Sequence, residues 1–160
     1  MDNLTNEIVT AHVEDTLMLN RLIVTAYATN NRMAVGGGFL KSYIIDASDE
    51  RYADVAKMRG VMDIEDVIRV FEQVVPSSEK VTNGAVYTPR YIREYVVAHV
   101  LATVKKPHAD CLCADIACGC GAFLYTLAEK IMESTDERTS DVISRLYGLD
   151  ISQTSVERTK

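Results

Sequence analysis

The sequence contains no tryptophan, only three prolines and no long apolar run. No hydrophobic stretch approaches the roughly 20 residues that cross a bilayer. The acidic start MDNLTNEIVTAHVEDT also lacks the positive flank of a secretory signal. We therefore expect a cytoplasmic protein that is not inserted in a membrane.

Acidic residues outnumber basic residues in this chain. There are 17 Lys and Arg against 23 Asp and Glu in 160 residues, which gives a formal net charge of −6. A surface that holds nucleic-acid phosphates needs clustered Lys and Arg. Any contact with nucleic acid is therefore expected to require another, basic element. The hydrophobic content of 48% is enough to bury a globular core.

All four cysteines lie within ten residues, at Cys111, Cys113, Cys118 and Cys120. Such crowding does not resemble the spread of a disulfide framework, so free thiols are expected. A four-thiolate zinc site is the alternative, but zinc knuckles usually place about two to four residues between paired cysteines. Cys111 and Cys113 fall in an apolar segment, where buried cysteine is a common small core residue. We therefore predict packing and no metal, with Cys118 and Cys120 in tight loop positions.

The first half of the chain predicts a helical region over residues 1–75. Residues 5–28 carry apolar side chains near one face and few breakers, which predicts one long helix. The glycines at 36–38 interrupt the chain. Residues 39–45 suit either a short strand or a helical turn, and both remain open.

Two further helices are expected before a linker. One starts after Ser48, and the next begins at Asp63, an acid that can cap the stripe of apolar residues behind it. Pro76 marks the end of that helix. The residues of 76–83 suit an exposed loop, which predicts a linker there.

The pattern changes in residues 84–160. Thr88 can cap a helix whose first position is Pro89. Its predicted apolar face is Ile92, Val96 and Val100, and the tyrosines spaced by four at 87, 91 and 95 are expected to pack in a core or groove.

A strand, helix, strand unit follows. Residues 111–117 and 145–151 have the apolar character of buried strands, and 121–133 that of a helix between them. Such a unit pairs its strands in parallel. Another helix is expected after Ser152.

A ligand-binding loop is predicted where the first strand ends. Asp115 closes that strand, and Gly119 and Gly121 permit a sharp turn before a helix whose N-terminal amides attract negative charge. Asp150 ends the second strand, where an acid accepts the hydroxyls of a ribose in nucleotide-binding units. The loop has no Lys for a triphosphate. Carboxylates and glycine amides together suit a nucleoside with a cationic or mixed-charge tail.

These segments resemble a known family. D-I-A-C-G-C-G-A-F-L, residues 115–124, resembles the D-P-A-C-G-S-G-x-F-L loop of S-adenosylmethionine-dependent adenine-specific DNA methyltransferases. It departs from that loop at Ile116 and Cys120, and both departures leave the glycines intact. GAVYTP, 84–89, resembles the G-x-x-Y/F-T-P segment of type I modification subunits and fused restriction-modification enzymes. GLDI, 148–151, resembles the family's second-strand acid motif.

The resemblance implies an α/β fold, in which the N-terminal helical region precedes the start of an incomplete Rossmann-like methyltransferase sheet. It implies S-adenosylmethionine as the cofactor. Thr88 and Pro89 would lie against the methionine carboxylate, Asp115 and residues 119–121 would contact the methionine portion, and Asp150 would hold the ribose. The implied cofactor-binding residues are Tyr87, Thr88, Pro89, Asp115, Ala117, Cys118, Gly119, Gly121, Phe123, Asp150 and Ile151.

The separation of Gly119 from Asp150 is longer than in dinucleotide folds, where it is roughly 20 residues. We therefore expect residues 134–141 to form a loop excursion.

The family's catalytic tetrapeptide, N/D/S-P-P-Y/F, does not occur in the sequence. Its three prolines, Pro76, Pro89 and Pro107, are all separated from one another. The resemblance therefore implies the cofactor-binding N-terminal portion of a restriction-modification DNA adenine methyltransferase, inactive alone. An incomplete parallel sheet would leave an apolar edge and face uncovered.

Partners follow from the same resemblance. Double-stranded DNA would be bound by C-terminal regions that this sequence does not contain, and specificity or restriction subunits are the expected protein partners. Two alternatives stay open: a non-catalytic assembly or regulatory module, and a methyltransferase that acts on RNA or protein.

Overall fold

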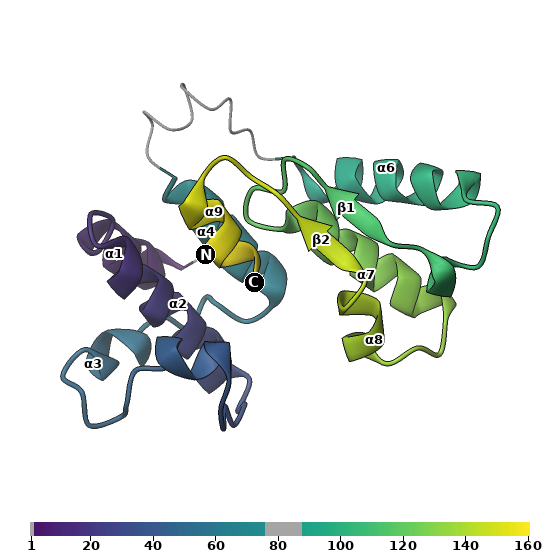
Figure 1. The fold of residues 1–160 in the computed structure, drawn as a ribbon. Coiled ribbons are helices and arrows are strands. Elements are labelled where there is room, and N and C mark those ends of the chain that lie inside the picture. Colours follow the sequence, from purple (N-terminus) through teal and green to yellow (C-terminus); the bar gives the residue numbers. More distant parts are fainter. Residues whose placement is uncertain (1, 76–87) are drawn as a thin grey trace. The chain divides into compact units, whose positions relative to one another are not determined.

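The computed structural model describes residues 2–75 and 88–160 (Figure 1). The chain divides into two compact units, Met1–Val75 and Pro76–Lys160. The described residues are mostly helical and contain one two-stranded parallel sheet. Within them, no helix is both long enough and apolar enough to cross a membrane. The predicted linker and Tyr87 lie outside the described residues.

The first unit is built around one buried helix. α2 packs against η1, α3 and α4. Asn30, the last residue of α2, donates from Nδ2 to the carbonyl oxygens of Met58 at 2.9 Å and Val61 at 2.8 Å. The elements in chain order are α1 (Asn3–Ala11), α2 (Thr16–Asn30), the 3-10 helix η1 (Phe39–Tyr43), α3 (Tyr52–Val55) and α4 (Ile64–Gln73).

The single helix predicted over residues 5–28 is wrong, because α1 and α2 are separate helices. The Asp15 side chain accepts a hydrogen bond from the Met18 amide at 2.9 Å and so caps the start of α2. An acid that satisfies the free amides of a new helix competes with continuation of the preceding one. The apolar residues keep the same helical spacing on both sides of the break, so their periodicity alone does not reveal that two helices are present.

The other predictions for this unit are mostly confirmed. The undecided segment 39–45 contains a helical turn, η1, and the helix expected after Ser48 is the short α3. Asp63 caps α4 as predicted. The cap is reciprocal, since Asp63 accepts from the Asp66 amide at 2.8 Å while the Asp66 carboxylate accepts from the Asp63 amide at 3.2 Å.

The second unit contains the predicted strand, helix, strand unit. β1 and β2 are parallel, and Cys113 pairs with Leu146 and Asp115 with Gly148. α7 packs against both strands and against α6, as Figure 1 shows. The elements are α6 (Arg90–Thr103), η2 (His108–Asp110), β1 (Cys113–Asp115), α7 (Ala122–Ser134), α8 (Thr139–Ile143), β2 (Leu146–Gly148) and α9 (Gln153–Thr159).

The helices predicted over 121–133 and after Ser152 are confirmed by α7 and α9, and the Ser152 side chain caps α9. The loop excursion predicted over 134–141 is only partly correct. α7 extends through Ser134, and α8 begins at Thr139, which leaves a shorter connection. Arg138 pairs with Asp141 one turn later at 2.9 Å and helps a polar sequence to form the helix.

The two strands are shorter and less buried than predicted. Each has three residues, and one face of the sheet is exposed. Residues that pair in a parallel sheet point to the same face. The exposed face carries Leu112, Ala114 and Ile116 beside Tyr147 and Leu149. This is the uncovered apolar face that the sequence predicted for an incomplete sheet.

The apolar face predicted for α6 lies within the helix, but it is not the face that α6 buries. Ile92, Val96 and Val100 are exposed, and the residues that α6 buries are Arg93 and Val97. The tyrosines of this helix do not pack in a core either, because Tyr91 is 71% exposed. Helical spacing shows which residues share a face, but the neighbouring element decides which face it covers.

The helix start is shifted by one residue as well. Pro89 is the N-cap of α6 and not its first residue, and it makes no side-chain cap.

The core of the second unit lies where α7 meets α8. Ala128, Ile131 and Val142 are buried together, and partly buried side chains of Leu101, Leu127, Met132 and Leu146 pack around them. This cluster fixes α7 against β2.

Candidate functional site

The loop between β1 and α7 is bonded to the segment that follows β2. The amide of Leu149 donates to the carbonyl of Asp115, and the amide of Cys118 donates to the carbonyl of Leu149, both at 2.9 Å. The Gly121 amide then donates to the Cys118 carbonyl at 2.9 Å and closes a tight turn. The parallel pairing therefore continues beyond the strands and orders the glycine loop.

Both predicted glycines adopt backbone conformations that favour glycine. φ is 53° at Gly119 and 82° at Gly121, which is the N-cap of α7. An added Cβ at Gly119 would meet nothing within 4 Å, so that side of the loop is open. At Gly121 it would lie 3.1 Å from Cγ2 of Thr159. Gly119 thus leaves room for a ligand, whereas Gly121 lets α9 approach closely.

Asp150 joins the two loops. Its Oδ2 accepts from the Gly119 amide at 2.9 Å, and its Oδ1 accepts from the Ser152 amide at 2.8 Å. Asp115 makes a local bond, since its Oδ1 accepts from the Ala117 amide at 3.0 Å. The structure therefore brings Asp150 to the glycine loop, with each carboxylate oxygen holding one backbone amide.

Cys118 and Cys120 occupy buried loop positions, as predicted. Burial raises the pKa of the Cys118 thiol, and a hydrogen-bond contact with the Thr159 hydroxyl partly opposes this. Thr159 also donates to the Gly119 carbonyl at 2.8 Å. All four cysteines are free thiols, and the described part of the chain contains no group of three or more His, Cys, Asp or Glu placed to hold a metal.

A cavity of about 330 Å³ lies between α6, the end of β1 and the first half of α7. Of the predicted cofactor-binding residues, Asp115 and Phe123 line it. Its remaining walls are apolar: Val96, Val97, Val100, Ala114, Ile116, Leu124 and Leu127. Gly119 and Asp150 are not among its lining residues, so the cavity adjoins the glycine loop without including its centre.

The remaining predicted residues are placed around this loop. Ala117 is exposed, Ile151 is 81% exposed, and Thr88 and Pro89 are half-buried at the start of α6. No hydrogen bond links Thr88 directly to the glycine loop among those of the described residues. The contact between these two segments is made by Arg93.

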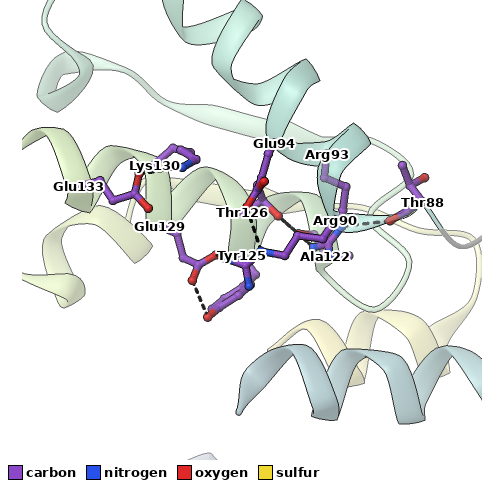
Figure 2. Close-up of polar contacts among 10 residues, drawn as sticks. All are labelled: Thr88, Arg90, Arg93, Glu94, Ala122, Tyr125, Thr126, Glu129, Lys130 and Glu133. Carbon is purple, nitrogen blue, oxygen red and sulfur yellow. Dashed lines mark hydrogen bonds and ion pairs between the residues drawn. The ribbon is translucent and has the colours of Figure 1, made fainter.

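Sequence reasoning missed Arg93. Its Nε donates to the Thr88 carbonyl at 3.0 Å, and its Nη1 donates to the Ala122 carbonyl at 2.8 Å and the Thr126 hydroxyl at 2.9 Å. Figure 2 shows the side chain extending from α6 across the first turns of α7. The available signal was its spacing of four from both Pro89 and Val97, which places all three on one face.

A second set of contacts joins α6 to α7 at the surface. Arg90 pairs with Glu94 at 2.9 Å and with Glu129 of α7 at 3.1 Å, and the Tyr125 hydroxyl donates to Glu129 at 2.8 Å (Figure 2). The Arg90 guanidinium lowers the pKa of Glu94. Exposed pairs of this kind stabilise weakly. The buried hydrogen bonds of Arg93 therefore determine how α6 and α7 are aligned more than the exposed Arg90 pairs do.

A protein-family model described as N-6 DNA Methylase matches residues 63–160, more than half of the chain. This chain belongs to the N-6 DNA methylase family. The match confirms the resemblance predicted from the glycine loop. It also begins at Asp63, the cap of α4, and so extends upstream of the motif-bearing residues that start at 84.

Family membership sets the general chemistry. N-6 DNA methylases transfer a methyl group from S-adenosylmethionine to the amino group of adenine, with DNA as the substrate. Neither the search of curated proteins nor that of solved structures yielded a match.

Proposed function

We propose that this N-6 DNA methylase chain is the S-adenosylmethionine-binding portion of a restriction-modification DNA adenine methyltransferase. The observation that supports this most directly is the bond from the Gly119 amide to Asp150. It holds the acid after β2 against the glycine loop after β1. A nucleoside bound beside this loop would meet the Asp150 carboxylate.

The carboxylate can hold a ribose while it keeps its bonds to the loop. Each oxygen of an ionised carboxylate has two acceptor sites. In the structure, each Asp150 oxygen accepts one backbone amide. One acceptor site therefore remains on each oxygen. The two oxygens together can accept hydrogen bonds from the two neighbouring hydroxyls of a ribose.

The proposed binding residues come from three segments. The segment before α6 supplies Tyr87, Thr88 and Pro89, although Tyr87 is proposed from sequence alone. The glycine loop and the start of α7 supply Asp115, Ala117, Cys118, Gly119, Gly121 and Phe123, and the segment after β2 supplies Asp150 and Ile151. Phe123 and Asp115 would place part of the cofactor at the mouth of the apolar cavity.

We further propose that the 160 residues bind the cofactor without transferring its methyl group. The adjacent prolines of the catalytic tetrapeptide do not occur in the sequence. In the full reaction, double-stranded DNA would be recognised by other regions, in line with the acidic balance of this chain. Specificity or restriction subunits are the proposed protein partners, and a cytoplasmic location stays a prediction.

A second candidate function is a non-catalytic assembly module. The exposed strand face formed by Leu112, Ile116, Tyr147 and Leu149 favours it, because apolar patches of this kind often bind other polypeptide surfaces. Binding to a specificity subunit without any affinity for S-adenosylmethionine would support this function. An RNA or protein acceptor is less favoured, since the matching family acts on DNA.

The decisive experiment is calorimetric titration of the folded 160-residue chain with S-adenosylmethionine, with ATP as the control nucleotide. We expect one S-adenosylmethionine to bind per chain and ATP to bind far more weakly, because the loop has no Lys for a triphosphate. A chain that is folded by circular dichroism and binds neither ligand would contradict the proposal. Methyl incorporation into duplex DNA by this chain alone would contradict the proposed lack of transfer.

A further inference from the structure

Arg93 is the only charged residue buried among the described residues, with 0% of it exposed. It lies on α6, one turn after Pro89. Its guanidinium is surrounded by oxygen acceptors from two segments that are far apart in the sequence. Buried charges are retained where they meet such acceptors, because an unpaired charge in the interior is strongly unfavourable.

Hydrogen bonds to three acceptors of the described residues help to define the position of this guanidinium. The bond from Nε ends on the Thr88 carbonyl, in the segment before α6, and the two from Nη1 end on Ala122 and Thr126 in the first turns of α7. The Thr126 hydroxyl itself donates to the Ala122 carbonyl at 3.0 Å. Figure 2 shows the three acceptors grouped around one end of the Arg93 side chain.

The choice of arginine follows from this arrangement. A planar guanidinium presents donors in fixed directions and reaches acceptors on two segments at once, whereas the single ammonium of lysine cannot reproduce that geometry. A buried apolar side chain of similar volume would often stabilise a fold equally well. The contacts of Arg93 therefore point to control of register and not to stability alone.

We propose that Arg93 is a positioning residue, which locks the Thr88–Pro89 segment to the helix that follows the glycine loop. This inference rests on the proposed function, in which both segments contact S-adenosylmethionine. Arg93 acts through Thr88 and α7 and does not touch the cofactor. The two halves of the cofactor site then keep a fixed separation before the ligand arrives, which lowers the ordering cost of binding.

The proposal makes a ligand-dependent prediction. Thr88 is proposed to meet the methionine end of the cofactor, whereas Asp150 is proposed to meet the ribose. Loss of the Arg93 bonds should therefore weaken binding of S-adenosylmethionine while adenosine, which has no methionine, is affected much less. A purely structural role would weaken both ligands in the same proportion.

The test uses the 160-residue chain with Arg93→Met and Arg93→Lys. Val142→Ala is the control, because Val142 lies in the α7–α8 core and is not one of the proposed ligand-binding residues. Thr126→Val and Thr126→Ser form a milder pair, since only the serine retains the hydroxyl that Arg93 bonds. The ligands are S-adenosylmethionine and adenosine, titrated separately, and thermal unfolding is measured for every variant.

We expect Arg93→Met to weaken S-adenosylmethionine binding roughly tenfold or more, the change that corresponds to about 1.4 kcal/mol. We expect Arg93→Lys to weaken it less, and adenosine affinity to change by less than about threefold in both. Thr126→Val should shift the ratio of the two affinities in the same direction, and Thr126→Ser should not. Equal losses for both ligands, or losses matched by Val142→Ala, would overturn the proposal.

A ligand-free measurement separates this inference from the proposed function. In hydrogen exchange, Arg93→Met should raise exchange in residues 90–93 and 122–126 together, relative to Val142→Ala. Unchanged exchange in either segment would overturn the positioning role. If wild type fails to bind S-adenosylmethionine, the proposed function fails, and the exchange result still decides whether Arg93 couples the two segments.

Discussion

Replacement of Asp150 by alanine tests the site most directly, because the structure assigns this residue a role even without ligand. Asp150 accepts hydrogen bonds from the amides of Gly119 and Ser152. A residue that served only as a ribose ligand would leave the unbound protein unaffected when removed. Asp150→Ala should instead destabilise the second unit before any cofactor is added.

The magnitude follows from the two lost bonds. Hydrogen bonds to a charged acceptor contribute about 1.5–3 kcal/mol each when buried. Both amides are only partly buried, so water replaces part of what the carboxylate supplied. We therefore expect a total loss of about 1–3 kcal/mol in the free energy of unfolding. For a unit of the size of Pro76–Lys160, each kcal/mol lost lowers the melting temperature by about 4–8 °C.

The assay is thermal unfolding without ligand, followed by titration with S-adenosylmethionine. Asp136→Ala is the matched control, because it removes the same charge from an exposed position in the same unit. Asp150→Asn should fall between wild type and Asp150→Ala, since the amide oxygen can still accept from one backbone amide while its NH₂ faces the other. If Asp150→Ala melts like Asp136→Ala and binds the cofactor like wild type, both the anchoring role and the ribose role are refuted.

Three further predictions concern the loop and the core. Gly119→Ala should cost about 1–2 kcal/mol, because the new side chain must adopt a left-handed backbone conformation. Gly121→Ala should destabilise the protein by more, because only there does the new Cβ also approach Thr159. Calorimetric melting measures both losses, and Thr159→Ser should recover part of the difference between them. Because burial raises the pKa of the Cys118 thiol above 9.0, the folded state retains this proton longer than the unfolded chain does. The free energy of unfolding should therefore be highest below about pH 9 and decrease as the pH rises through the folded pKa, and Cys118→Ala should reduce this slope in urea titrations; an equal slope in the variant would contradict the assignment. Val142→Ala should lower the free energy of unfolding in urea by about 2 kcal/mol, which is the transfer free energy of the lost methyl groups plus the cost of a small cavity. An unchanged free energy of unfolding would show that the α7–α8 core relaxes fully.

The local signals in the sequence predicted much of the fold. The acid at Asp63, the glycines of the loop and the serine at 152 each mark the start of a helix where one occurs. Such signals are reliable because caps and left-handed turns depend on the residue itself and its next few neighbours. The break between α1 and α2 is the exception. There the cap at Asp15 was hidden inside an apolar pattern that continues on both sides of it.

Burial was predicted less well, because it depends on what covers each face. Ile92, Val96 and Val100 share a helical face as predicted, yet α7 packs against the neighbouring face that carries Arg93 and Val97. Ile116 has the apolar character of a buried strand residue but is 82% exposed. Periodicity determines which side chains point together, and tertiary contacts alone decide which of those sets is enclosed.

The candidate site divides in the same way. The sequence by itself determined the family, the glycine loop and the acid that follows the second strand, because a sharp turn and a strand end need particular residue types at fixed spacing. Only the tertiary structure showed that Asp150 holds the Gly119 amide and that Arg93 bridges Thr88 to α7. The bonds from Gly119 to Asp150 and from Arg93 to Ala122 join residues separated by about thirty positions in the chain. Chain folding, and no local spacing rule, brings such residues within hydrogen-bond distance.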